Sequence, residues 1–188
     1  MIRLVGPGGA GKSTIGALLA ERLKVSFLDL DRRFADGLGD IGEYLGRYGY
    51  DAYARANVET YCSSVRAEAT PEVVALSSGF MTYARDIHPE YPRVCCEIAQ
   101  SPTTFVLLPA VDRDVCVAET VQRQIGRPFG RSANREEAVI RARFEIYMAI
   151  PARKIETMRS VAAAVDEIIA SLPRKRASRA RASETREL

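Results

Sequence analysis

Short apolar runs alternate with longer amphipathic segments along most of this chain. Four runs, at residues 2–5, 25–28, 73–76 and 104–108, have the length and composition of strands that are buried on both faces of a sheet. Helical patterns lie between them, which predicts an α/β fold with a parallel sheet flanked by helices. In such a fold the functional site lies at the carboxyl ends of the strands.

The first and last predicted helices have the clearest apolar stripes. Residues 12–24 place Ile15, Leu19 and Leu23 at helical spacing, and residues 160–172 carry a similar stripe that ends before Pro173. Residues 36–61 are interrupted by glycines, so we predict two helices there, within a cap of about residues 32–61. Residues 124–134 are polar and cationic and contain glycine, which predicts a mobile covering loop inside a lid of about residues 120–135.

The first predicted strand leads directly into a glycine-rich loop. Residues 6–14 read GPGGAGKST, which fits the Walker A pattern G-x-x-x-x-G-K-S/T. Glycines let backbone N–H groups approach phosphate oxygens, and the N-terminus of the next helix favours an anion at the same place. Lys12 would contact the β- and γ-phosphates, and Ser13 would bind Mg²⁺. The residues predicted to hold a nucleoside triphosphate are Gly6, Gly8, Gly9, Ala10, Gly11, Lys12, Ser13 and Thr14.

Two carboxylates follow the second predicted strand, in the segment FLDLD at residues 27–31. Residues two apart on a strand point to the same side, which would direct Asp29 and Asp31 together toward the phosphate loop. Asp29 would then hold Mg²⁺ through a water, and Asp31 would deprotonate an attacking hydroxyl. The alternative is that both residues simply cap the next helix.

Composition limits the other possibilities. The 188 residues, 47% of them hydrophobic, fit one domain over residues 1–172, without an apolar run that could span a membrane and without a signal peptide, so we expect a cytoplasmic protein. Residues 173–188 form a basic tail that we expect to be disordered and not to bind nucleic acid. The four cysteines lack metal-binding spacing and are interpreted as reduced thiols. We expect a monomer.

Taken together, these motifs resemble the shikimate kinases, from residue 2 to about residue 172. Besides the Walker A loop and the F-x-D-x-D segment, Arg127-Pro128 stands where the family has its lid motif R-P-L-L, and Arg143 begins a segment similar to R-x-P-L-Y. The resemblance implies a P-loop kinase fold and transfer of phosphate from MgATP to the 3-hydroxyl of shikimate. It also implies that Asp31 and Arg143 contact the acid substrate and that Arg127 closes over the transferring phosphate. An arginine in that position would stabilise the charge of the transition state.

The departures from the family pattern all fall in the part of the site that would bind the acceptor substrate, which we call the acceptor side. Ala54 and Asn57 replace the arginine and glutamate of the family segment G-E-x-x-F-R-x-x-E, and Arg55 comes one residue late, which rotates it by about 100° on a helix. Ser77-Ser78-Gly79 replaces G-G-G and keeps only Gly79 as a substrate contact. Arg85 in the next loop is a second candidate, with Arg55, to replace the missing cation.

Two further residues lie near these motifs. We expect the single histidine, His88, to be a solvent-exposed loop residue. Arg123 lies closer to the lid than the arginine that the family usually has before it, which leaves the adenine contacts open.

Three functions remain at this point. The first is a shikimate kinase with a relocated cation, and the second is a similar phosphotransferase for another hydroxylated metabolite or an antibiotic. The third is a nucleotide-binding regulatory protein without efficient transfer. Lys12, Ser13, Asp29, Asp31 and Arg127 together favour an active kinase, since a nucleotide sensor needs neither a base nor a lid cation.

Overall fold

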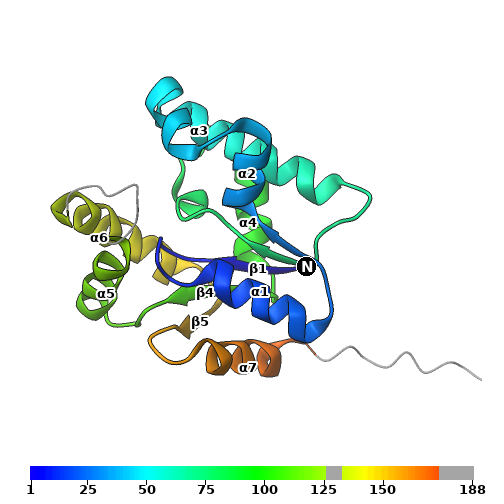
Figure 1. The fold of residues 1–188 in the computed structure, drawn as a ribbon, viewed down its shortest axis with the longest axis vertical. Coiled ribbons are helices and arrows are strands. Elements are labelled where there is room, and N and C mark those ends of the chain that lie inside the picture. Colours follow the sequence, from blue (N-terminus) through cyan, green and yellow to red (C-terminus); the bar gives the residue numbers. More distant parts are fainter. Residues whose placement is uncertain (126–132, 174–188) are drawn as a thin grey trace, which may run out of the picture.

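A computed structural model describes residues 1–125 and 133–173, with side chains described for residues 1–124 and 137–173. Its centre is a parallel sheet in the order β2-β3-β1-β4-β5 (Figure 1). The strands are β1 (Ile2–Val5), β2 (Phe27–Asp29), β3 (Val73–Ala75), β4 (Thr104–Leu108) and β5 (Arg153–Glu156). The fold class predicted from the alternating pattern is confirmed.

Helices cover both faces of the sheet, because the strand side chains alternate between two apolar cores. Phe105 and Leu107 of β4 face the core that contains α1 (Lys12–Leu23) and α7 (Val161–Ser171). Val106 and Leu108 face the second core, which the remaining helices complete. These are α2 (Leu30–Leu38), α3 (Ile41–Arg66), α4 (Tyr91–Gln100), α5 (Arg113–Ile125) and α6 (Ala133–Ala149), with the short 3₁₀ helix η1 (Phe80–Thr82).

The second and fifth strands differ from the sequence prediction. β2 begins at Phe27 rather than at residue 25, because Val25 still belongs to the turn that closes α1 through its N–H bond to Ala20 O. β5 was missed entirely. It is an edge strand that pairs only with β4, and Ile155 is its single buried residue, so it lacks the apolar run by which the other strands are recognised.

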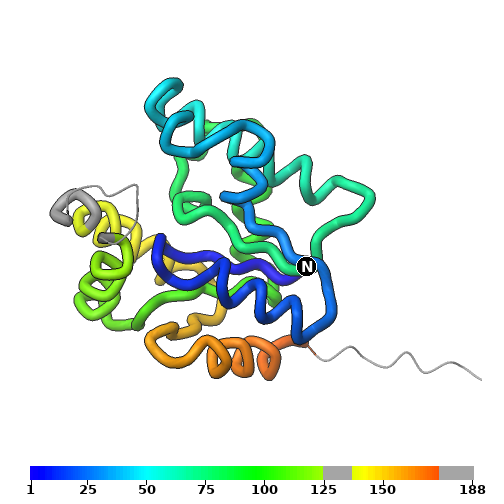
Figure 2. The backbone as a smooth tube through the Cα atoms, in the orientation of Figure 1, coloured from blue at the N-terminus to red at the C-terminus, as the bar shows by residue number. Residues whose placement is uncertain are grey.

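The segment predicted to form a cap consists of α2 and most of α3, and these helices lie together at the end of the molecule away from α7 (Figure 2). α3 is bent at Gly49, whose φ of 82° is in the left-handed region that favours glycine. The ring of Phe34 in α2 contacts Tyr44 before the bend and Tyr53 after it, both with ring centroids 5.1 Å away. The prediction that glycines divide this segment is therefore correct at Gly49.

Several sequence predictions fall outside the described residues. The central part of the expected lid, with Arg127 and Arg131, lies in residues 126–132, and the basic tail lies mostly in residues 174–188. α5 precedes and α6 follows residues 126–132. None of the helices in the described ranges is long and apolar enough to cross a membrane.

Candidate active site

The phosphate loop connects β1 to α1 at the carboxyl edge of the sheet. A Cβ on Gly6 would lie 2.1 Å from the carbonyl oxygen of Leu107, so the loop passes too close to β4 for any side chain there. Gly9 and Gly11 have φ values of 78° and 84°, which favour glycine. Gly11 is the N-cap of α1, with no side-chain cap and no acidic residue in the first turn. The amide groups at this helix end are therefore suited to an anion.

Lys12 is folded back across this loop. Its side chain is only 9% exposed, and Nζ donates hydrogen bonds to the carbonyl oxygens of Gly6 and Pro7, both at 2.8 Å. Ser13 and Thr14 are in the first turn of α1, where Thr14 is exposed. The structure thus brings the predicted nucleotide-binding residues into one loop, with the lysine charge held against it.

The carboxyl-terminal end of α5 lies over the same loop. Arg123 donates from Nη1 to Gly9 O at 3.1 Å and to Thr157 Oγ1 at 3.3 Å, and from Nη2 to Thr157 O at 3.2 Å. Its Nε pairs with Glu119 at 2.7 Å. Gln124 lies beside Gly8, where a Cβ would meet its Nε2 at 1.9 Å. Arg123 therefore joins α5, the phosphate loop and the segment after β5, a role that its sequence position alone did not indicate.

Asp29 and Asp31 occupy different elements. Asp29 ends β2 and caps α2, since its Oδ1 accepts the N–H groups of Asp31 at 3.0 Å and Arg32 at 3.2 Å. Asp31 lies in the first turn of α2, so the strand alternation used to align the two carboxylates was wrong. The capping alternative is correct for Asp29. Asp31 is exposed, and its negative charge acts on Tyr53 and Tyr83 of the acceptor side.

Arg143 reaches the acceptor side from α6. Its Nη2 donates a hydrogen bond to the hydroxyl of Tyr50 at 3.0 Å. Both groups lie next to Gly79, where a Cβ would be 3.0 Å from Tyr50 Oη and 3.4 Å from Arg143 Nη2. Tyr147, one turn further along α6, donates to Ser78 O and ties this helix to the loop after β3. Arg143 and Gly79, both predicted substrate contacts, are thus brought together.

A buried polar network joins α3 to Ser77 and Tyr83, in the segment after β3. Asn57, which is 0% exposed, donates from Nδ2 to Ser77 Oγ at 3.0 Å and accepts from the Tyr83 hydroxyl at 3.1 Å. The Tyr53 oxygen lies beside the hydroxyls of Ser77 and Tyr83 and accepts from Ser77. Burial, followed by the charge of Asp31, raises the pKa of Tyr53, and burial raises the pKa of Tyr83 strongly. These phenols therefore stay neutral, and Tyr83 donates its proton to Asn57.

The family model for shikimate kinase matches residues 8–173 of the chain. The chain belongs to the shikimate kinase family. A shikimate kinase of Pseudomonas entomophila is 31% identical over 169 residues, covering 82% of this chain and 84% of that protein. One of Marinomonas is 36% identical over 81 residues, which cover 43% of this chain and less than half, 44%, of that protein.

The fold agrees with this membership. The chain is similar to the structure of a shikimate kinase from Acinetobacter baumannii in complex with shikimate. The match covers 90% of this chain and 88% of that one, with a TM-score of 0.63 and 25% sequence identity. The family resemblance and the P-loop kinase fold inferred from the sequence are confirmed. The prediction of a phosphotransferase with an alcohol acceptor agrees with the family.

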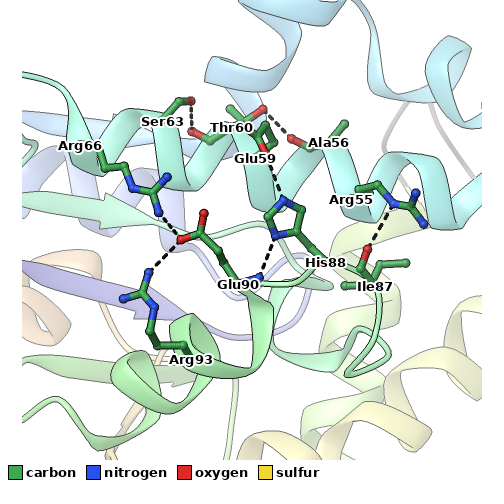
Figure 3. Close-up of polar contacts among 10 residues, drawn as sticks. All are labelled: Arg55, Ala56, Glu59, Thr60, Ser63, Arg66, Ile87, His88, Glu90 and Arg93. Atoms are coloured by element: carbon green, nitrogen blue, oxygen red, sulfur yellow. Dashed lines mark hydrogen bonds and ion pairs between the residues drawn. The ribbon is translucent and has the colours of Figure 1, made fainter.

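Arg55 of this shikimate kinase family protein does not lie at the acceptor side. Tyr50, Tyr53 and Asn57 share the face of α3 that lines the polar network, whereas Arg55 is on another face and donates from Nε to Ile87 O at 3.2 Å (Figure 3). A cavity of about 470 Å³ lies on that other face, lined by Tyr44, Ala52, Arg55, Ala56, Glu59 and His88. The one-residue shift noted in the sequence is not compensated by the bend at Gly49, so Arg55 does not replace the missing cation.

His88 is also not the exposed loop residue that we expected. Its side chain is 13% exposed, with Nε2 3.0 Å from Glu59 Oε2 of α3 and Nδ1 accepting the N–H of Glu90 at 3.1 Å. The carboxylate of Glu90 in turn pairs with Arg66 and Arg93 (Figure 3). His88 therefore fastens its loop to α3. No local pattern indicates this contact, because Glu59 is 29 residues away in the chain.

Arg85, the other candidate cation, is exposed and lies near α4. Its charge lowers the pKa of the Cys95 thiol, against the larger effect of burial, which raises it. The charge of Arg85 thus acts on a residue of α4, and no contact in the described residues links it to Arg143. Tyr50 is the acceptor-side residue that the sequence analysis missed.

Proposed function

We propose that this protein transfers the γ-phosphoryl group of ATP to a hydroxyl of shikimate or of a closely similar hydroxylated acid. One arrangement carries the proposal. The phosphate loop, Asp31 and Gly79 follow strands β1, β2 and β3, which are adjacent in the sheet and end at the same edge, and Arg143 reaches Gly79 from α6. A triphosphate and an anionic acceptor would therefore meet there. The Acinetobacter baumannii shikimate kinase, whose structure is a complex with shikimate, supports this acceptor.

In this proposal the residues divide the work as follows. The loop amides and Lys12 hold the β- and γ-phosphates, and Arg143 binds the acceptor carboxylate, for which its planar guanidinium is well suited. The acceptor hydroxyl attacks the γ-phosphorus, its proton passes to the carboxylate of Asp31, and ADP leaves. Arg127, outside the described residues, would stabilise the charge on the transferring group.

The local chemistry also fits Mg²⁺. Ser13 supplies a hydroxyl in the first turn of α1, and Asp29 uses Oδ1 for its cap, so that Oδ2 remains as an oxygen ligand for the metal's water shell. When bound, Mg²⁺ neutralises charge on the β- and γ-phosphates. We further infer a cytoplasmic monomer, which cell fractionation and sedimentation velocity test.

The test is a coupled assay of ADP release with MgATP and a panel of hydroxylated compounds. Shikimate-dependent turnover at micromolar to millimolar concentrations is the expected result. Turnover of another member of the panel in preference to shikimate would identify a different acceptor, an outcome that Ala54 favours because it is fully buried and supplies no charge. ATP binding without turnover of any compound would indicate the regulatory protein instead.

A further inference from the structure

The hydroxyl of Tyr50 and the guanidinium of Arg143 meet at the entrance of the acceptor side. They are 3.0 Å apart, although the residues are 93 positions apart in the chain. Tyr50 is 41% exposed, and its hydroxyl contacts the arginine. Gly79 lies directly beside both groups and has no side chain to fill the space.

The bend in α3 determines where Tyr50 lies. Before Gly49, the ring of Tyr48 contacts that of Tyr44 at a centroid distance of 4.6 Å, with the Arg47 guanidinium carbon 5.2 Å from its own centroid. After it, the ring of Tyr50 contacts Tyr53 at 6.3 Å and Tyr83 at 6.0 Å. The two tyrosines on either side of one glycine are thus directed to different surroundings, and of these two only Tyr50 contacts Arg143.

The direction of the hydrogen bond decides what the pair offers to a ligand. A guanidinium only donates, so the Tyr50 oxygen is the acceptor and its own O–H proton is available for a third group. Arg143 has further N–H groups beside it. The pair therefore presents two kinds of donor, a cation and a neutral phenol, with a single positive charge in total.

We propose that Tyr50 and Arg143 together form a clamp for the carboxylate of the acceptor, an inference that rests on the proposed function. The planar fork of the arginine matches a carboxylate, and the phenol adds a second donor to the same anion. A single positive charge is complementary to a monocarboxylate. The phenol thus supplies a donor that the sequence pattern led us to seek at Arg55 or Arg85.

The experiment compares Tyr50→Phe with Tyr48→Phe, a matched variant across the bend whose ring contacts Tyr44 and Arg47 instead of Arg143. Both replacements keep the aromatic ring. With shikimate, Tyr50→Phe is expected to raise the acceptor KM about tenfold or more, as for loss of a hydrogen bond to a charged group, with the KM for ATP unchanged. kcat should stay within about threefold, since the binding lost is the same in the ground and transition states. Tyr48→Phe should alter neither constant.

A second substrate separates the clamp from simple packing. The carboxamide of shikimate lacks the negative charge, so the wild-type preference for the acid over the amide should fall in Tyr50→Phe. An unchanged acceptor KM, or equal losses for acid, amide and ATP, would overturn the inference.

Calorimetry keeps the two proposals distinguishable. If the wild-type protein binds shikimate but does not phosphorylate it, the proposed function fails. The clamp then still stands or falls on whether Tyr50→Phe weakens that binding. If the wild-type protein binds no shikimate, the clamp for this acid is refuted.

Discussion

Arg123 in α5 donates a hydrogen bond from Nη1 to the carbonyl oxygen of Gly9 in the phosphate loop, at 3.1 Å. The same guanidinium holds both the hydroxyl and the carbonyl of Thr157, just beyond β5. A loop with several glycines has many accessible backbone conformations, and this contact restricts them from outside. The arginine therefore links α5 to the phosphate loop, at the helix that precedes residues 126–132.

Replacing Arg123 by methionine is therefore expected to raise the KM for ATP about tenfold, because hydrogen bonds from a charged donor to the loop are lost. The acceptor KM should change little. Arg123→Lys should recover only part of the loss, since an ammonium cannot hold Gly9 and Thr157 in the same fork. Steady-state kinetics with varied ATP measures this, and the exposed neighbour Gln122→Ala is the control. An ATP KM within twofold of the wild type in Arg123→Met would show that the bracing is unimportant.

Lys12→Ala should lower kcat/KM for ATP by about a hundredfold to a thousandfold, as expected for loss of one preorganised charged donor to the transferring group. The matched variant is Lys24→Asn, at the other end of α1, where the backbone φ of 55° suits asparagine. It should leave the rate unchanged. Circular dichroism confirms that both variants fold, and full activity of Lys12→Ala would refute the assignment of the phosphate loop.

Asp31→Asn tests the general base. Removing the base should lower kcat at least a hundredfold while nucleotide binding is retained. Asp36→Asn, also an exposed aspartate of α2, provides the comparison. A rate for Asp31→Asn within about threefold of the wild type would assign proton removal to another group, and calorimetry with ATP would show whether the loop itself is intact.

Local patterns were sufficient for the parts of this fold that are built from contiguous residues. The strand, loop and helix at residues 2–23 form one unit with its own periodicity and motif, and the structure follows it closely. β5 has one buried residue and three more polar ones, so its identity as a strand depends on pairing with β4 rather than on its own composition. No periodicity reveals such an edge strand.

The acceptor side could be predicted only in part, because its contacts join distant elements. Arg143 and Gly79 were identified from the family resemblance, but the position of Tyr50 depends on the bend at Gly49 and on the approach of α6. Asn57 was recognised as a departure, whereas its pairing with Ser77 and Tyr83 is visible only in the folded chain. Arg55 shows the reverse case, a candidate by sequence that the helix face directs elsewhere.

Asn57→Ala is expected to destabilise the protein by about 2–3 kcal/mol, since it leaves the buried hydroxyls of Ser77 and Tyr83 without this partner. Urea unfolding followed by circular dichroism measures the change in the free energy of unfolding. Ser63→Ala, on an exposed position of the same helix, should change it by less than about 0.5 kcal/mol. Equal effects of the two substitutions would show that the buried network contributes nothing to stability.

The buried tyrosines predict unfolding at alkaline pH. Burial raises the pKa of Tyr53, Tyr83, Tyr91 and Tyr147 above the ordinary value near 10. The unfolded chain therefore releases these protons at a lower pH than the folded chain does. The stabilisation is complete below about pH 10 and is lost progressively as the pH rises above it. A titration followed by the ultraviolet absorbance of phenolate should show that these tyrosines ionise together with the loss of helical circular dichroism.

Tyr147→Phe removes one such group and should lessen the dependence of stability on pH above about 10, whereas Tyr48→Phe, whose ring is exposed, should not. Ionisation of every tyrosine before any loss of helical signal would contradict this account.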